Sequence, residues 1–364
     1  MAAAAETNAT ANNAKARVLV IGCGGVGTMC AYNLEVGGKA NVTAVLRSNF
    51  AAVEKNGFSI KSIEHGEVEG WRPSEKQINN INHIYKKAEK FDFIVVTTKN
   101  LPDVPPTVPE IIAPAVTEGH TAIMLLQNGL NIEKPLFAAF PNNVILSGVS
   151  LISATETQPG RIVHDDPDRL IVSPFRNPNG RADQELAAAK RFVDMYSASG
   201  KVSCQLDENV GLVRWRKLIY NASYNSVCAI LGMDTTRMRF AKHPLTDLIR
   251  PAMWEVWHTA RAAGYELPHD VVEEMVDVDL WAFFKPSMLQ DLEKADCSFS
   301  TRQGNFIEFE NIVGEPLREA QKLGVSTPTL TIIYGMLKAL QWKIREQKGM
   351  ITVPLQRPED LDLS

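Results

Sequence analysis

Cysteine is scarce in this sequence, and its arrangement favours neither disulfide bonds nor a structural metal site. The 364 residues include five cysteines, an odd number at widely scattered positions: Cys23, Cys30, Cys204, Cys228 and Cys297. None of them forms a CxxC pair, and none lies near two histidines at zinc spacing. We therefore expect a reducing compartment and no bound metal.

Long apolar runs are also lacking. No stretch reaches the roughly 18 apolar residues that a bilayer-spanning helix needs. Residues 1–15 have neither the apolar core of a secretory signal nor the arginines of a transit peptide. The formal net charge of −4 gives no overall attraction to nucleic acid or to an anionic membrane, so any anionic ligand must be held by a local cluster. We expect a cytoplasmic protein with a disordered tail at 1–15.

The first half of the chain alternates short apolar runs with longer amphipathic stretches. Its clearest strands are expected at 17–22, 41–46, 91–98, 121–127 and 143–152. The runs that begin at Arg161 and Arg169 are expected to form a hairpin at the sheet edge. From about Asp207 the apolar residues recur with helical spacing. These patterns predict an α/β protein, with a Rossmann-type parallel-sheet domain at 16–206 followed by a mostly α-helical C-terminal domain at 207–364.

Two sets of side chains are expected to have structural places. His164 and His243 stand in turn-like sequence, which predicts surface positions. The aromatic residues of the second domain, such as Trp257, Trp281 and Phe283, are assigned to the core or to an interface, because helical spacing explains them.

A glycine-rich turn directly follows the first expected strand. Its glycines have the spacing G-x-G-x-x-G, and the residues after it can open a helix whose N-terminal amides would face a pyrophosphate. Glycine-rich turns also occur for structural reasons alone, but here the strand and the helix stand where the dinucleotide fold needs them. We expect a dinucleotide site formed by Gly22, Cys23, Gly24, Gly25, Val26 and Gly27.

The end of the second expected strand favours NADPH over NADH. About 20 residues past the motif, NAD enzymes carry an acidic residue for the ribose 2'-hydroxyl, whereas NADP enzymes place an arginine near the 2'-phosphate. This chain has Leu46, Arg47 and Ser48 there. A guanidinium offers bidentate donors to a phosphate, so we expect NADPH. A solvated arginine at a strand end is the alternative.

Further motifs follow the glycine-rich turn along the chain. After GCGGVG and LRS come VTTK at 96–99, QNG at 127–129, WRK at 215–217, SMLQD at 287–291 and EFENIVG at 308–314. Taken in this order, they resemble the motifs of the ketopantoate reductase (2-dehydropantoate 2-reductase) family. The later motifs are far more specific than the glycine-rich turn, and together they extend over nearly the whole chain after the tail. The resemblance implies NADPH-dependent reduction of 2-dehydropantoate to (R)-pantoate, a step of pantothenate biosynthesis on the way to coenzyme A.

The resemblance also implies which residues contact the cofactor. It implies that Arg47 holds the 2'-phosphate and that Lys99 and Asn128 border the dinucleotide. Asn128 is further implied to face the substrate.

For the substrate, a 2-keto acid, the resemblance implies five residues of the second domain together with Asn128. Lys217 is implied as the proton donor, with Glu308 hydrogen-bonding the substrate hydroxyl. Asn221 and Asn225 are implied to orient the substrate, and Ser287 to bind its carboxylate.

One interval departs from the family pattern. The glutamate follows the serine more closely in the family, and ADCSFSTRQGN at 295–305 looks like extra sequence. Glu308 is assigned by its distance to Gly314, so Glu310 remains a rival. The role of the extra segment stays open.

The residues themselves suit such chemistry. Lys217, Asn221 and Asn225 are spaced i, i+4 and i+8, so on a single helix they would share one face. An asparagine pair in an otherwise apolar helix needs partners for its amides, which a polar ligand supplies. Reduction of a keto acid builds negative charge on the carbonyl oxygen, where a lysine can provide both charge and proton. A solvated helix face is the alternative.

Two other functions are left open by the sequence. One is reduction of another 2-keto acid, or of a ketone of a specialised pathway, on the same fold. The other is a non-catalytic NADPH-binding sensor, against which the presence of Lys217 and both asparagines argues, because a sensor needs only the first domain. The sequence does not give the oligomeric state, and a homodimer stays open.

Overall fold

The computed structural model describes residues 15–81, 90–294 and 304–354. These residues form two compact units, which part between Val213 and Arg214. All but the last residue of the expected tail at 1–15, and most of the extra segment at 295–305, lie outside the described residues. Within the described ranges, no helix is both long enough and apolar enough to cross a bilayer.

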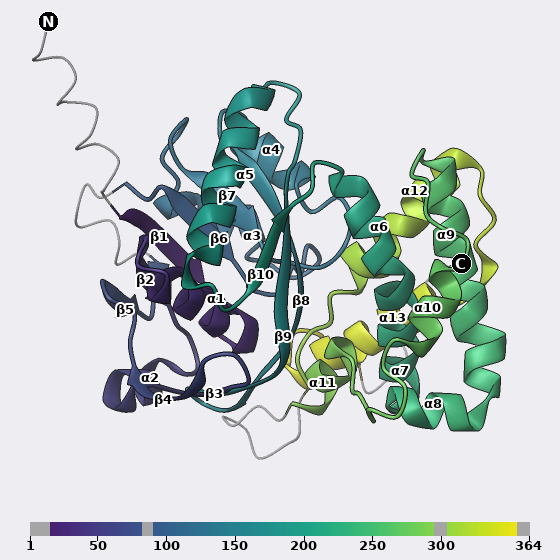
Figure 1. Cartoon of the computed structure of the whole chain (residues 1–364). Helices are drawn as coiled ribbons and strands as arrows, with labels where there is room; N and C mark the ends of the chain where they lie inside the picture. The colour runs from purple at the N-terminus through teal and green to yellow at the C-terminus, as the bar shows by residue number, and fades with distance from the viewer. Residues whose placement is uncertain (1–14, 82–89, 295–303, 355–364) are drawn as a thin grey trace, which may run out of the picture. The chain divides into compact units, whose positions relative to one another are not determined.

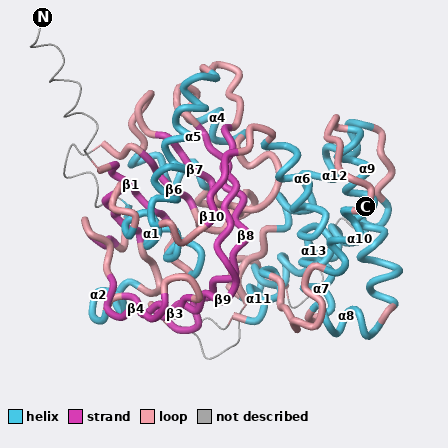
Figure 2. Tube along the Cα trace, viewed as in Figure 1, coloured by secondary structure: helices cyan, strands magenta, loops and turns pink. Residues whose placement is uncertain are grey.

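The first unit is a mixed, mostly parallel sheet covered by helices (Figures 1 and 2). The strand order is β4-β3-β9-β8-β7-β6-β1-β2-β5, with β10 beside β9. The strands are β1 Ala16–Ile21, β2 Ala40–Val45, β3 Phe58–Ser62, β4 Gly66–Trp71, β5 Lys76–Ile78, β6 Phe93–Val96, β7 Ala122–Leu125, β8 Ile145–Gln158, β9 Arg161–Pro174 and β10 Ser203–Leu206. The helices are α1 Gly25–Val36, α2 Phe50–Asn56, α3 Val108–Ile112, α4 Lys134–Ala139 and α5 Ala182–Tyr196, with short 3-10 turns η2 Ala113–Ala115 and η3 Ser197–Ser199.

Burial on both faces explains why the central strands are continuous apolar runs. In β1, Val18 and Val20 join the core cluster that includes α1 and α5 residues, whereas Leu19 and Ile21 join the cluster on the other face. A parallel strand covered on both sides has no polar face. The five expected strands are therefore present, as β1, β2, β6, β7 and β8.

The expected edge hairpin is wrong. The two runs from Arg161 and Arg169 form one 14-residue strand, β9, which pairs antiparallel with β8 and parallel with β3 inside the sheet. Pro167 lies within this strand, and the β8–β9 register shifts between Leu151 and Ser153, opposite that point. Such an irregularity lets a strand accommodate a residue that has no backbone N–H to donate.

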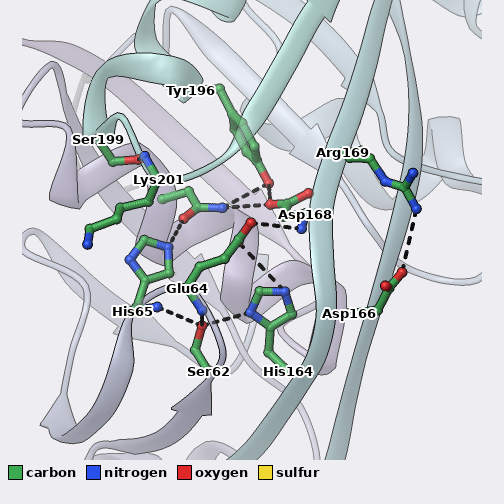
Figure 3. A network of polar contacts seen from close by, with 11 residues as sticks. Ser62, Glu64, His65, His164, Asp166, Asp168, Arg169, Tyr196, Ser199 and Lys201 are labelled. Atoms are coloured by element: carbon green, nitrogen blue, oxygen red, sulfur yellow. Dashed lines mark hydrogen bonds and ion pairs between the residues drawn. The ribbon is translucent and has the colours of Figure 1, made fainter.

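A buried polar network ties the β3–β4 hairpin to the helices beside it (Figure 3). The side-chain amide of Asn33 on α1 donates to Asp168 Oδ2 on β9 at 2.7 Å, and the hydroxyl of Tyr196 on α5 donates to the same oxygen at 2.6 Å. His65 Nε2, in the turn of the hairpin, lies 2.6 Å from Asn33 Oδ1. The network connects α1, α5 and β9 to the hairpin, and most of its polar side-chain groups form their hydrogen bonds with one another.

The two histidines expected at the surface behave differently. His243 is exposed. His164 is buried on β9, with its Nδ1 2.8 Å from Ser62 Oγ on β3 (Figure 3). The surface position expected for His164 is therefore wrong, because β9 continues through the sequence that looked like a turn.

The second unit is helical. Its elements are the end of α6 Val210–Tyr220, then η4 Asn221–Asn225, α7 Ser226–Leu231, α8 Thr235–Ala241, η5 Pro244–Ile249, α9 Arg250–Ala262, α10 Val271–Asp277, α11 Ser287–Glu293, η6 Glu310–Gly314, α12 Glu315–Leu323 and α13 Pro328–Gln347. Together with the first unit, this confirms the expected fold class of a mostly parallel sheet followed by a helical region.

The helix that carries the expected site residues is not uniform. After α6 ends at Tyr220, Asn221–Asn225 form the π-helical segment η4, and α7 follows. The hydroxyl of Ser223 donates to the carbonyl of Ile219 at 2.6 Å, so a side chain competes for a carbonyl of the helix ladder. The simple i, i+4, i+8 face of one α-helix is therefore a wrong prediction. Single π turns are rare and often stand at functional sites.

The segment between α10 and α11, residues 278–286, is irregular rather than helical. Trp281 and Phe283 have left-handed backbones, with φ of 62° and 47°, and their exposed fractions are 67% and 56%. They are not part of the core, unlike Trp257, which is buried.

Candidate functional site

The residues expected near a cofactor follow the carboxyl ends of four neighbouring parallel strands. Gly22 comes directly after β1, Arg47 shortly after β2, Lys99 after β6 and Asn128 after β7. The side chain of Arg47 is exposed, and those of Lys99 and Asn128 are partly buried. In open α/β sheets, ligands bind beyond this edge.

The glycine-rich turn has the shape that a dinucleotide needs. Gly22 has φ +97°, and a Cβ there would lie 2.9 Å from the backbone nitrogen of Thr98. A Cβ on Gly27 would collide with the Gly22 carbonyl, so this glycine allows α1 to pack closely on β1. A Cβ on Gly24 would meet nothing within 4 Å, so the backbone is open to a ligand there. These are the three functions of the motif glycines, and the turn fits a pyrophosphate.

The turn is held by side chains that sequence reasoning missed. Asn49, buried before α2, donates from Nδ2 to the carbonyl of Cys23 and to Glu156 Oε1 on β8, both at 2.8 Å. Gln127 donates to the carbonyl of Thr98 at 2.7 Å and so joins the loops after β6 and β7. The signal for Asn49 was weak, because a lone amide in a loop has many uses, and Gln127 stood out only as part of the QNG motif.

The thiol in the turn is not a nucleophile. Burial, together with the nearby Glu156 carboxylate, raises the pKa of the Cys23 thiol to about 12. Because the thiolate is the reactive form, Cys23 is a packing residue at neutral pH.

In the second unit, Lys217 has an unusual electrostatic environment. It lies near the end of α6 and is partly buried. Burial and the charge of Arg214 lower the pKa of its ammonium, Glu308 opposes them, and the net pKa is about 8. Arg214 and Glu308 are each only 4% exposed. A lysine with a pKa near 8 can release a proton at physiological pH.

Glu308 and Glu310 have different surroundings. Glu310 uses both carboxylate oxygens: Arg318 donates to Oε2 at 3.0 Å and the Tyr334 hydroxyl donates to Oε1 at 2.8 Å. Glu308 is buried and is the carboxylate that acts on Lys217. The contacts of Glu310 are those of a structural ion pair, and they favour Glu308 as the glutamate of the lysine cluster.

The expected asparagines and serine lie on adjoining elements. Asn221 and Asn225 are both buried, at the first and last positions of η4. Asn225 Nδ2 donates to Ser287 Oγ, at the first position of α11, at 3.3 Å. Asn221 is only 7% exposed, and a buried side-chain amide needs hydrogen-bond partners, which a polar ligand or water supplies.

The comparisons with known proteins concern the family and the fold of the chain. The model "Ketopantoate reductase PanE/ApbA" matches residues 18–177, and its C-terminal counterpart matches 209–341. An uncharacterized Saccharomyces cerevisiae protein, YDL144C, is 35% identical, with 92% of this chain and 96% of that protein covered. The 2-dehydropantoate 2-reductase of Methylococcus capsulatus has a similar solved structure, with a TM-score of 0.72, 28% identity, and 90% and 97% of the two chains covered.

One structural neighbour has another substrate. A D-mandelate dehydrogenase, solved with NADH and anilino(oxo)acetate, has a TM-score of 0.73 at 20% identity, with 90% of this chain and 99% of that chain covered. At that identity the likeness shows the fold alone. The two family models together match well over half of the sequence. The chain therefore belongs to the ketopantoate reductase family, whose members are NADP-dependent oxidoreductases that act on CH–OH groups.

Proposed function

We propose that this protein reduces 2-dehydropantoate to (R)-pantoate with NADPH, as a cytoplasmic enzyme of pantothenate biosynthesis. The observation that carries the proposal is the partly buried Lys217, whose pKa is lowered to about 8 beside the buried carboxylate of Glu308. Membership in the family supports the reaction type.

The chemistry requires a proton at the ketone oxygen. When bound, NADPH supplies the hydride that adds to the carbonyl carbon of the keto acid. Lys217 donates a proton from its ammonium to the carbonyl oxygen, so the ketone becomes a secondary alcohol and the amine is left neutral. Its positive charge stabilises the negative charge that develops on the oxygen before the proton moves. General acid catalysis typically accelerates a reaction by about 10²- to 10⁴-fold. Solvent returns the proton to Lys217 for the next turnover.

The neighbouring polar groups hold the keto acid in place. The amides of Asn221 and Asn225 orient the substrate, and Ser287 binds its carboxylate. Glu308 accepts a hydrogen bond from the hydroxyl end of pantoate. An ionised Glu308 would repel the substrate carboxylate. We therefore place it at the hydroxyl end of the substrate, with the positive charge of Lys217 compensating its negative charge.

The first unit determines the cofactor. The turn at 22–27 holds the pyrophosphate, Arg47 pairs with the 2'-phosphate, and Lys99 and Asn128 border the dinucleotide. The exposed guanidinium of Arg47 stands after β2, where an acidic residue would select NADH.

The test is a steady-state comparison of 2-dehydropantoate with other 2-keto acids, each with NADPH and with NADH. The expected result is the highest kcat/KM for 2-dehydropantoate with NADPH. A clearly higher value for an aromatic 2-keto acid would transfer the proposal to another substrate on the same site. Tight NADPH binding without reduction of any keto acid would replace the enzyme with a sensor.

A further inference from the structure

The irregular segment 278–286 is attached to η4 at both of its ends. Near its start, Asp279 Oδ2 accepts a hydrogen bond from the hydroxyl of Tyr220, the residue just before η4, at 2.7 Å. Just after its end, Ser287 Oγ accepts from Asn225, the last residue of η4, at 3.3 Å. The two ends of the segment are therefore linked to the two ends of η4, which carries both asparagines of the site.

The contact at Asp279 is part of a larger, mostly buried cluster. Arg239 Nη2 on α8 donates to Asp279 Oδ1 at 2.6 Å, and Arg239 Nε donates to the carbonyl of Val276 at 3.1 Å. The same carbonyl accepts the hydroxyl of Tyr224 at 3.1 Å, and the guanidinium lies 5.0 Å from the Tyr224 ring centre. The side chains of Arg239 and Asp279 are 12% and 15% exposed. Charge-assisted hydrogen bonds are strong in such surroundings.

The middle of the segment is held against α8 in an unfavourable conformation. The backbone nitrogen of Phe283 donates to Thr236 Oγ1 at 2.9 Å, and the backbone nitrogen of Thr235 donates to the carbonyl of Phe284 at 3.0 Å. Left-handed φ angles at Trp281 and Phe283 are costly for bulky residues. The local sequence does not favour this shape, so the contacts at Asp279, α8 and Ser287 must maintain it.

The cluster contacts η4 through two tyrosines. Tyr220 and Tyr224 are four residues apart with ring centres 5.0 Å from each other, and both hydroxyls are anchored on the α10 end and the segment after it. Asn221 and Asn225 each follow one of these tyrosines. If the tyrosines turn, both amides turn with them, because a helical segment rotates as a unit.

We propose that Asp279 is a positioning residue for the 2-keto acid. Through Tyr220 and Arg239 it sets the rotation of η4, and with it the direction of Asn221 and Asn225 and the place of Ser287. The inference rests on the proposed function, since it assigns the ligand of that same site. Asp279 itself does not touch the substrate.

Asp279→Asn tests the proposal, because the amide keeps the size of the side chain but has only one acceptor oxygen for its two donors. The expected result is a roughly tenfold or larger rise in the KM for the keto acid, since a shift of about 1 Å in a positioning group can cost about 100-fold. The KM for NADPH stays unchanged. Tyr220→Phe, a milder change, gives a smaller rise, and the double variant is less than additive because both act through one contact.

Glu255→Gln is the matched control for loss of stability. Glu255 is another buried carboxylate of the same unit, and it accepts the backbone nitrogens of Thr329 and Leu330 at the start of α13. Both variants lower the unfolding midpoint, but only Asp279→Asn raises the KM for the keto acid. Equal kinetic effects of the two variants would overturn the positioning role.

Hydrogen exchange of the protein without ligand separates this inference from the proposed function. Asp279→Asn should speed exchange of the backbone amides at 221–225 and 278–287, whereas Glu255→Gln should not. Unchanged exchange at 221–225 would overturn the role of Asp279, whatever the activity. If the parent reduces no 2-keto acid, the proposed function and the assigned ligand fail together, while faster exchange would still establish that Asp279 holds η4.

Discussion

At the scale of single residues, the proton on Lys217 depends on two charged neighbours with opposite effects. Arg214, three residues earlier on α6, disfavours a second positive charge, whereas the carboxylate of Glu308 favours it. Burial has the largest effect, because the ammonium loses hydration. The pKa of about 8 is the net result, and each neighbour can be removed separately.

A first prediction concerns the pH profile of reduction. Because the ammonium is the proton donor, kcat/KM should fall as the pH rises through about 8. Arg214→Gln removes a charge that lowers the Lys217 pKa, so the fall should move to higher pH. Glu308→Gln removes a charge that raises it, so the fall should move to lower pH. Pre-steady-state or steady-state rates from pH 6 to 10 measure these shifts.

Arg216→Gln is the control for that profile. Arg216 is exposed and pairs with Glu274 at 3.0 Å, so its charge is screened by water and its loss should leave the profile in place. A shift equal to that of Arg214→Gln would mean that overall charge, rather than the buried guanidinium, sets the pKa of Lys217.

A second prediction at this scale concerns Arg47. Arg47→Ala should raise the KM for NADPH by roughly 10- to 150-fold, since a hydrogen bond to a charged group contributes about 1.5–3 kcal/mol. The KM for NADH should change little, because NADH has no 2'-phosphate. Equal use of the two cofactors by the unaltered protein would contradict the proposed role of Arg47.

At the scale of elements, the sequence predicted the strands and turns that are determined by residues close together in the chain. Buried parallel strands appear as apolar runs, and the glycine spacing indicated the turn after β1. The β8–β9 pairing was not predicted, because Pro167 looked like a turn and its accommodation depends on the register of a neighbouring strand. The π-helical segment was also missed, since α and π turns share one sequence pattern and differ through contacts such as those of Tyr220 and Tyr224.

The site residues show the same division. Spacing along the chain could place Lys217 and Asn221 near each other. It could not find Arg214 or Asp279, because their importance depends on burial and on partners from other elements. It also could not decide between Glu308 and Glu310, which differ in the presence of Arg318 and Tyr334 rather than in local sequence.

A prediction for the β3–β4 hairpin follows from His65. Burial lowers the pKa of His65 below 6.5, and the charges of His164 and Lys201 act in the same direction. The depressed pKa means that stability from neutral His65 is present above pH 6.5 and is lost as the pH falls through the folded-state pKa. The unfolding midpoint should therefore fall less on acidification in His65→Gln than in the parent.

The quantity to compare is the difference in unfolding midpoint between the parent and His65→Gln at each pH. Burial raises the pKa values of Asp168 and Glu64, so these carboxyls stabilise the fold at low pH and lose that contribution as the pH rises. Their effect opposes that of His65 but is common to parent and variant. Thermal unfolding from pH 4.5 to 8 gives both curves, and identical pH dependence would show that His65 does not titrate in the network.

At the scale of the whole molecule, the two compact units carry different parts of the proposed reaction. The glycine-rich turn and Arg47 belong to the first unit, whereas Lys217, Glu308 and both asparagines belong to the second. Cofactor affinity and proton transfer should therefore be separable by single substitutions. A sensor that only binds NADPH would need neither Lys217 and Glu308 nor the two asparagines.

Lys217→Ala makes this separation directly. If the ammonium donates the proton, the variant should lose on the order of 100-fold or more in turnover, the range expected for loss of a general acid. Its Kd for NADPH, measured by fluorescence titration, should stay close to that of the parent, because the residues proposed to hold the cofactor lie in the other unit. Arg216→Ala, an exposed change on the same helix, should affect neither quantity. Full turnover by Lys217→Ala would place the acid elsewhere in the protein or in an ordered water. A large loss of NADPH affinity would instead show that Lys217 acts through cofactor binding. A group that stabilises only the transition state changes the rate of reduction and leaves the Kd for NADPH unchanged.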